Sequence, residues 1–167
     1  MSDDLSFSDI PTSSLSEDQL RDLMSLCSGI GPSYLSALKK THGVIVANLR
    51  SPEGFVAYID LPEKDSIYIS LICSKKVKGG LGKRLLEHIE GKGRSKILAC
   101  VVEQAIGFYL RMGFVFSKSI SDFPNRYEMD ERDEDFFPED DWFFGSIVET
   151  DDSVEVNCVA MEKHLAK

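Results

Sequence analysis

Hydrophobic and polar positions change their spacing repeatedly along the chain, which predicts alternating strands and helices. Short apolar runs bounded by glycine, proline or charged turns predict strands over residues 5–10, 44–49, 54–61, 67–73, 96–102 and 154–161. Apolar residues at helical spacing predict helices over residues 17–27, 32–40, 82–90 and 105–112. The first helix also has a capping box, because Ser16 and Gln19 can satisfy each other's free amides.

The order of these elements predicts an α/β fold with a mixed sheet. Between residues 67 and 102 a strand, a helix and a strand follow one another, which implies a right-handed crossover and a parallel pair. The earlier strands are joined by short turns and should pair antiparallel. We therefore expect a single domain over residues 1–167, with a mostly antiparallel sheet, one parallel pair and helices on both faces.

Composition sets the broad class of the protein. The chain is 43% hydrophobic and 28% charged, which is typical of globular proteins. Its longest apolar runs, at 67–73 and 97–102, are too short to cross a bilayer. The acidic N-terminus lacks the basic and apolar regions of a signal peptide. We therefore expect a cytoplasmic protein.

The cysteines and histidines indicate no metal site. Cys27 falls in a predicted helix, whereas Cys73, Cys100 and Cys158 fall in predicted strands, without CxxC or Cys/His ligand spacing. The three histidines are scattered. We expect free, buried cysteines that act as small hydrophobic side chains, and no metal.

The net charge of −9 is concentrated in one segment. Acidic residues dominate positions 122–155, where only Arg126 and Arg132 oppose them, and aromatic residues are interleaved with the acids. We interpret residues 120–153 as an acidic, aromatic-rich insertion. Such a surface repels nucleic acid and attracts cationic amines or basic peptides, although solubility or partner binding would explain it equally well.

A glycine-rich turn over residues 77–83 follows the strand at 67–73 and opens the next helix. Backbone amides in such a turn, together with the helix dipole, form an anion site suited to a pyrophosphate. Lys78 and Lys83 could add positive charge at its rim. A P-loop is excluded, since Val77 and Arg84 stand where it needs glycine and Ser or Thr. The dinucleotide fingerprint is excluded by Leu85, which replaces its third glycine.

Residues 67–114 resemble the cofactor-binding core of the GNAT superfamily of N-acetyltransferases. The family's pattern Arg/Gln-x-x-Gly-x-Gly/Ala is matched at Gly80 and Gly82, but Val77 replaces its first residue. The family's later pattern Asn-x-x-Ala-x-x-Phe-Tyr-x-x-x-Gly-Phe is also matched in part, with Val102 in place of the Asn. The matching positions of this second pattern are Ala105, Phe108, Tyr109, Gly113 and Phe114.

The resemblance implies acetyl-CoA as co-substrate and assigns roles to particular residues. The pantetheine arm would pair with the strand backbone at Ser70, Leu71 and Ile72, and an amide there, that of Ile72, would polarise the thioester. The pyrophosphate would bind at Val77, Lys78, Gly79, Gly80, Leu81, Gly82 and Lys83.

Two residues are assigned to proton transfer. Tyr109 would act as general acid toward the leaving thiolate. The general base is open between Glu103 and a chain of water molecules.

The predicted function is transfer of an acetyl group from acetyl-CoA to a primary amine by direct attack in a ternary complex. Polyamines, other small cationic amines and basic peptide or protein amines all remain as acceptors. The alternative is a non-catalytic GNAT-like binding module that uses the acidic segment. The departures from the family patterns at Val77 and Val102 favour this alternative. The acceptor, the pathway and the oligomeric state, including a homodimer, stay open.

Overall fold

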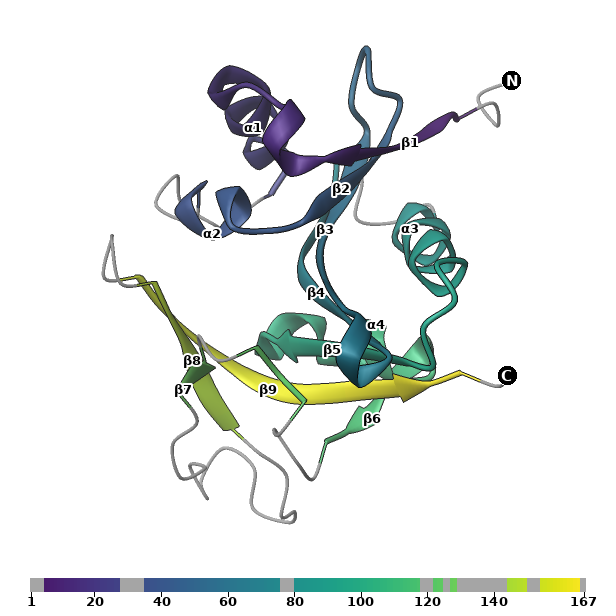
Figure 1. Cartoon of the computed structure of the whole chain (residues 1–167), viewed down its shortest axis with the longest axis vertical. Helices are drawn as coiled ribbons and strands as arrows, with labels where there is room; N and C mark the ends of the chain where they lie inside the picture. Colours follow the sequence, from purple (N-terminus) through teal and green to yellow (C-terminus); the bar gives the residue numbers. More distant parts are fainter. Residues whose placement is uncertain are drawn as a thin grey trace. The chain divides into compact units, whose positions relative to one another are not determined.

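The computed structural model describes residues 5–27, 35–75, 80–117, 122–124, 127–128, 144–149 and 154–165. Within these residues the chain forms two compact units (Figure 1). Unit 1 comprises Met1–Asp60 and Ile69–Gly93, and unit 2 comprises Leu61–Tyr68 and Arg94–Lys167. Strand β4 (Ser66–Ser74) therefore starts in unit 2 and continues in unit 1.

Unit 1 is built on three antiparallel strands, followed in the strand order by β4. These strands are β1 (Phe7–Pro11), β2 (Gly43–Ala47) and β3 (Gly54–Leu61). β1 pairs antiparallel with β2, and β2 pairs antiparallel with β3, with Gly43 opposite Tyr58. Every residue of β2 is buried, as a strand covered on both faces requires. The predicted strand at 44–49 ends early because Asn48 turns with a φ of 63°.

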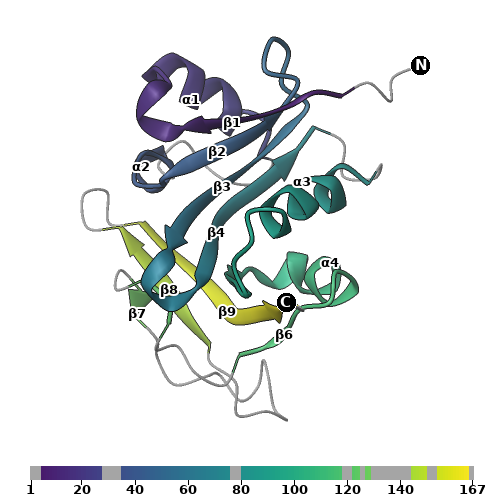
Figure 2. The ribbon, with the colours of Figure 1, turned by 45° about the vertical axis from the view of Figure 1, so that its right-hand side comes forward.

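Helices cover both faces of these strands, as the sequence predicts. They are α1 (Glu17–Met24), α2 (Leu35–Lys39) and α3 (Leu81–Glu90), and a 3-10 turn, η1 (Thr12–Ser14), precedes α1. Figure 2 shows α1 and α2 on one side of the strands and α3 on the other. Both hydrogen bonds of the predicted capping box are present at the start of α1.

Helix α1 is shorter than predicted and is tied to α2 by charge. It ends at Met24 rather than at residue 27. Lys39 of α2 donates to Glu17 at 2.5 Å, and Arg21 donates to the same carboxylate at 2.7 Å. The hydrogen bonds from Lys39 and Arg21 lower the pKa of Glu17. The buried face of α1 carries Leu20, Leu23 and Met24, which are apolar residues at the helical spacing that predicted this helix.

All four cysteines form disulfides, so the prediction of free thiols is wrong. Cys27 bonds to Cys73 within unit 1, and Cys100 bonds to Cys158 within unit 2. The two cysteines of each pair lie 46 and 58 residues apart in the sequence. Neither pair shows CxxC or other local spacing, and therefore the one-dimensional pattern gave no signal of the pairing.

Unit 2 is centred on the long strand β9 (Val154–His164), which pairs antiparallel on both sides. β5 (Lys96–Val101) lies along it with Lys96 opposite His164. Two strands lie on its other side, β6 (Val115–Phe116) near its end and β8 (Phe144–Glu149) near its start. β7 (Tyr127–Glu128) pairs with β8 in turn. The strands β6, β7 and β8 were not predicted, and β7 and β8 lie within the segment interpreted as an insertion.

The strand–helix–strand connection predicted over residues 67–102 is present as β4, α3 and β5. The first residues of β4, Ser66–Tyr68, belong to unit 2, where β5 is the next strand in the order. Unit 2 also holds the 3-10 turns η3 (Pro62–Lys64) and η4 (Glu103–Ala105) and the helix α4 (Ile106–Arg111). The protein thus has the predicted α/β class with a mostly antiparallel sheet. Among the described residues, no helix is both long and apolar enough to cross a membrane.

Candidate active site

The strand predicted to hold the pantetheine arm is β4. Its apolar run is buried from Ser66 to Leu71, and Ser70 and Leu71 are each 8% exposed. Ile72 is half-buried. Ser70, Leu71 and Ile72 thus lie in succession on one regular strand, directly before the disulfide-bonded Cys73.

The end of β4 is packed closely against the start of β3. The Lys75 amide donates to the Glu53 carbonyl at 2.8 Å. A Cβ atom on Gly54 would come within 2.9 Å of the Cys73 carbonyl oxygen and 2.7 Å of Leu81. Only glycine fits at position 54 without a shift, since real Cβ contacts are longer than these. The chain therefore enters the predicted pyrophosphate turn from a fixed point. Val77, Lys78 and Gly79 lie outside the described residues.

Gly80 is the N-cap of α3 and adopts a left-handed conformation, with a φ of 77° and a ψ of 4°. A Cβ atom there would meet nothing within 4 Å, so backbone conformation rather than crowding favours glycine. No described side chain caps the helix, whose first hydrogen bond runs from the Arg84 amide to the Gly80 carbonyl at 3.2 Å. The amides of the first turn and the helix dipole therefore suit an anion.

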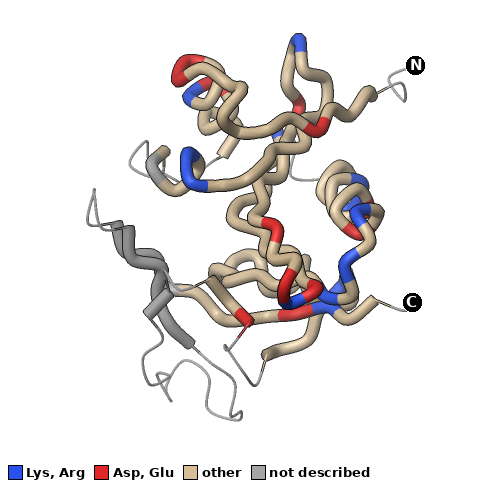
Figure 3. The backbone as a smooth tube through the Cα atoms, in the orientation of Figure 1, with Lys and Arg blue, Asp and Glu red and all other residues tan. Residues whose placement is uncertain are grey.

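The first turn of α3 contains basic residues, which are blue in Figure 3. Lys83 is exposed. Arg84 packs differently, because its guanidinium carbon lies 5.0 Å from the centroid of the Phe7 ring on β1. The same ring stacks on His88 at 4.3 Å. Phe7 thus holds one face of α3, and Lys83 is the exposed cation of its first turn. Leu81 and Gly82 are half-buried.

Tyr109 lies on α4 in unit 2 and is 5% exposed. Its ring meets the rings of Phe108 and Phe114 edge-on, with centroids 5.4 Å and 4.9 Å away. The Phe114 amide also donates to the Tyr109 carbonyl at 3.0 Å. The three aromatic residues of the second sequence pattern therefore form one cluster that fixes the ring of Tyr109. A tyrosine held in this way has few rotamers to lose when it takes part in a reaction.

Glu103, the predicted candidate base, begins the 3-10 turn η4 directly after β5. Its side chain lies outside the described part of the structure. Val102, which stands in place of the asparagine of the resemblance, is half-buried at the end of β5. The role of Glu103 stays a prediction.

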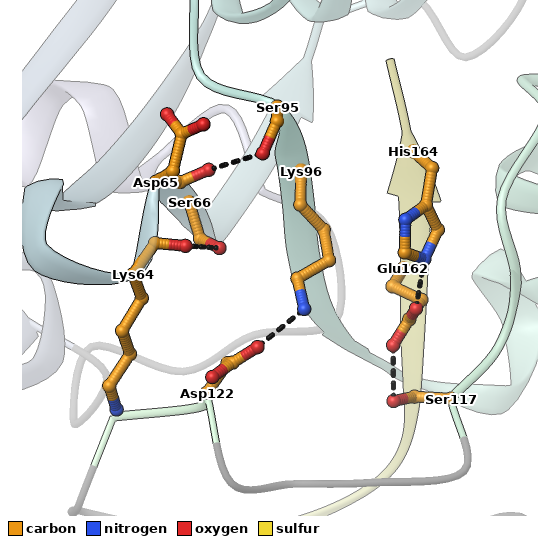
Figure 4. Close-up of polar contacts among 9 residues, drawn as sticks. All are labelled: Lys64, Asp65, Ser66, Ser95, Lys96, Ser117, Asp122, Glu162 and His164. Carbon is orange, nitrogen blue, oxygen red and sulfur yellow. Dashed lines mark hydrogen bonds and ion pairs between the residues drawn. The ribbon is translucent and has the colours of Figure 1, made fainter. Parts of the chain in front are cut away.

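Part of the acidic segment is attached to unit 2. Asp122 accepts from Lys96 of β5 at 2.5 Å (Figure 4). The neighbouring Phe123 is 4% exposed, and its ring lies 6.1 Å from the ring of Tyr68. The positive charge of Lys96 thus compensates the negative charge of Asp122. The charge pattern between residues 122 and 155 did not indicate this pairing. The acids from Asp130 to Asp141 lie outside the described residues.

A second polar cluster in unit 2 was missed by the sequence analysis (Figure 4). The buried Ser117 hydroxyl donates to Glu162 at 2.6 Å, and the other oxygen of Glu162 contacts the His164 ring. The carboxylate stands between the other two groups, whereas a catalytic triad needs histidine beside the serine. The cluster therefore links the residue after β6 to β9 without activating Ser117 as a nucleophile.

A third polar cluster, in unit 1, joins β1, β3 and the residues after α3. The Tyr58 hydroxyl donates to one oxygen of Asp9 at 2.6 Å, and Lys92 donates to the other at 2.5 Å. Burial and the hydrogen bond to Asp9 raise the pKa of Tyr58. Burial lowers the pKa of Lys92, but the hydrogen bonds to Asp9 and Tyr58 outweigh it, so the pKa is raised. These residues lie far apart in sequence, which explains why no local pattern indicated them.

The described residues contain no group of three or more histidine, cysteine or acidic side chains that could hold a metal ion. Unit 1 provides the backbone at the end of β4 and, at the start of α3, a helix N-terminus suited to an anion. Unit 2 provides Tyr109, whose ring is held by aromatic contacts, and the backbone of the Glu103 turn.

Several solved structures share this fold, although no known family model and no curated protein match the sequence. An IAA acetyltransferase from Bacillus cereus is 17% identical, with a TM-score of 0.59 over 96% of this chain and 99% of that one. A GNAT-family acetyltransferase from Staphylococcus aureus is 14% identical, with a TM-score of 0.60 over 96% of this chain and 100% of that one.

A further similar structure is among those that contain bound coenzyme A. It is the catalytic domain of the GCN5 histone acetyltransferase from Tetrahymena in complex with coenzyme A. The identity is 15% and the TM-score is 0.61, over 98% of this chain and 95% of that one. The alignments extend over nearly the whole chain, well beyond the residues that carry the sequence resemblance. The chain therefore has the fold of the GNAT acetyltransferases.

Proposed function

We propose that the protein is an N-acetyltransferase that moves the acetyl group of acetyl-CoA to a primary amine. The observation that carries the proposal is the left-handed Gly80 at the start of α3, the helix that follows β4 in the chain, in a GNAT fold. A helix N-terminus opened by glycine in this way suits a pyrophosphate. The coenzyme A bound to the similar Tetrahymena domain supports acetyl-CoA as the ligand.

The residues of unit 1 would bind the cofactor. The backbone of Ser70, Leu71 and Ile72 would pair with the pantetheine amides in the manner of an added strand. The amide of Ile72 would donate to the thioester oxygen as negative charge develops there. Losing one such donor typically costs about 3–4 kcal/mol of transition-state stabilisation. The amides of residues 77–83 would hold the pyrophosphate, with Lys83 adding charge.

Proton transfer would be divided between Tyr109 and a base. Tyr109 would donate its hydroxyl proton to the departing thiolate of coenzyme A. A primary ammonium has a pKa of about 10.4, so a base must take its proton before the amine attacks. Glu103 or a chain of water molecules would serve. The amine would then attack the thioester carbonyl directly, and the carbon–sulfur bond would break as the amide forms.

We propose cationic amines as the acceptor class, on the strength of the acidic positions between 122 and 155. Carboxylates would concentrate cations but also raise the pKa of a bound ammonium. They would therefore serve best at the mouth of the acceptor site, away from the reacting nitrogen. The cytoplasmic location expected from the sequence stays a prediction, and a homodimer stays open.

The test is a panel of polyamines, small cationic amines, neutral amines and basic peptides, each supplied with acetyl-CoA. Thiol release would be followed together with the mass of the acetylated product. We expect product with at least one cationic amine. If acetyl-CoA binds but no amine is acetylated, the binding module becomes the better account. If acetyl-CoA does not bind at all, both the enzyme and the cofactor assignment are wrong.

A further inference from the structure

Unit 1 contains a covalent cross-link beside the strand assigned to acetyl-CoA. The sulfur atoms of Cys27 and Cys73 are bonded, and their Cα atoms lie 5.1 Å apart. Cys73 directly follows the residues 70–72 that would pair with the pantetheine arm. Cys27 lies three residues beyond the end of α1. The disulfide therefore joins the helical side of unit 1 to the end of β4.

The same end of β4 is also held from the side of β3. The Lys75 amide donates to the Glu53 carbonyl at 2.8 Å, and the Lys75 ammonium lies 3.8 Å from the Glu53 carboxylate. Gly54 approaches the Cys73 carbonyl so closely that a side chain would not fit. The strand therefore ends in a packed position from which the chain passes into the pyrophosphate turn. The disulfide adds a covalent restraint from the α1 side.

On its other side the disulfide is attached to a fixed helix. Leu20, Leu23 and Met24 bury the inner face of α1, and Glu17 binds Lys39 of α2. The disulfide restrains β4 only if the segment that carries Cys27 is itself held in place. The packing of α1 holds that segment. While the disulfide is intact, the end of β4 cannot move away from the end of α1.

We propose that the Cys27–Cys73 disulfide anchors the end of β4, so that its reduction weakens acetyl-CoA binding. This inference rests on the proposed function. Reduction breaks the sulfur–sulfur bond and adds two electrons and two protons, giving two thiols. A dithiol reductant supplies both and becomes a disulfide itself. The reduced strand end has more conformational freedom, which the bound cofactor must remove at a cost in affinity.

The second disulfide provides a matched control. Cys100 and Cys158 are bonded within unit 2, where β5 and β9 also pair through their backbones. Reducing this bond would leave the end of β4 attached to α1. A C100S/C158S variant should therefore bind acetyl-CoA like the wild-type protein and should still respond to reduction. A C27S/C73S variant should bind weakly and should not respond.

The experiment is calorimetry with acetyl-CoA on protein purified without reductant, before and after treatment with a phosphine. A phosphine reduces disulfides without adding a thiol that resembles coenzyme A, and water supplies the oxygen of the phosphine oxide. Alkylation and mass spectrometry of each sample would identify which cysteines are free. Circular dichroism would confirm that the reduced protein remains folded. If C27S/C73S does not fold, the test is the acetyl-CoA affinity of the wild-type protein before and after reduction.

We expect the dissociation constant to rise about five-fold or more on reduction of the Cys27–Cys73 bond. Unchanged affinity in a folded protein whose Cys27 and Cys73 are alkylated would overturn the inference and leave the proposed function intact. Free Cys27 and Cys73 in the protein purified without reductant would also overturn it. Absence of binding by the fully oxidised wild-type protein would contradict the proposed function, and the inference would fall with it.

Discussion

The ring of Tyr109 meets the ring of Phe114 edge-on at 4.9 Å, and the Phe114 amide donates to the Tyr109 carbonyl at 3.0 Å. Together these contacts connect the helix α4 to the residue just before β6. The same two residues belong to the sequence pattern that suggested an acetyltransferase. In this chain the contacts give both aromatic side chains a packing role, and they hold the Tyr109 ring in place for the proton transfer that we propose.

Replacing Tyr109 with phenylalanine should separate the packing role of its ring from the proposed proton donation by its hydroxyl. The ring and its contacts with Phe114 remain, but the hydroxyl proton is lost. We expect turnover to fall by about 10²-fold or more, as is typical of a lost general acid, with little change in the affinity for acetyl-CoA. The control is Tyr58→Phe, which removes a hydroxyl hydrogen-bonded to Asp9 in unit 1. Equal turnover of Tyr109→Phe and the wild-type protein would exclude Tyr109 from the chemistry.

Replacing Gly80 with alanine should weaken acetyl-CoA binding. Its φ of 77° costs an alanine about 1–2 kcal/mol, and relief of that strain would move the first turn of α3. Since 1.4 kcal/mol is a factor of ten, we expect a loss of affinity of up to about thirty-fold. Gly93→Ala is the matched control, because Gly93 also has a positive φ and open space around it. Calorimetry should show weaker binding for Gly80→Ala alone. Equal losses in both variants would mean that general strain, not the turn, is responsible.

The polar cluster of Asp9, Tyr58 and Lys92 should make stability fall at alkaline pH. Both pKa values are raised in the folded protein, from 10.0 for Tyr58 and 10.5 for Lys92, so the folded state binds their protons more tightly. The resulting stabilisation is complete below these values and is lost as the pH rises through the folded pKa values. We expect the melting temperature to fall above about pH 10, and to fall less steeply for Tyr58→Phe combined with Lys92→Met. Parallel curves for the two proteins would contradict this.

The acidic segment should strengthen binding of cationic acceptors. Neutralising Asp133, Glu134 and Asp135 should raise KM for a cationic amine about three-fold or more at low salt, and added salt should shrink the difference. A variant that neutralises the exposed acids Asp18, Asp22 and Glu63 has the same net charge and is the control. Steady-state kinetics across a salt series would measure both. A KM that does not change with salt, or an equal rise of KM in the control variant, would exclude local attraction of the acceptor by the acidic segment.

Local patterns predicted the regular elements well, because those elements depend on neighbouring residues. The capping box at Ser16 and Gln19 and the order β4, α3, β5 follow from hydrophobic spacing and turn residues. The left-handed start of α3 at Gly80 also agrees with the glycine pattern that drew attention to the turn. The strand β8 escaped prediction because acids and aromatics interrupt any simple alternation around it.

Contacts between distant residues could not be predicted from one sequence. Cys27 and Cys73 are brought together by the packing of α1, which no spacing along the chain records. Lys96 and Asp122 are 26 residues apart and are likewise brought together only by the fold. The location of the protein stays a prediction, and the two disulfides weigh against a cytoplasmic one, since such bonds are rare in that compartment. The roles of Glu103 and of residues 77–79 also stay predictions.

Binding of acetyl-CoA is the central claim, and isothermal titration calorimetry of the oxidised wild-type protein tests it most directly. Acetyl-CoA and coenzyme A should each bind at one site per chain, and Gly80→Ala should bind both more weakly. The thiol-free fragment adenosine 3′,5′-bisphosphate is the control, since it lacks the pyrophosphate and the pantetheine arm and should bind far less tightly. Measurable binding of acetyl-CoA that weakens in Gly80→Ala is the result we predict. No heat of binding with either acetyl-CoA or coenzyme A would contradict the account.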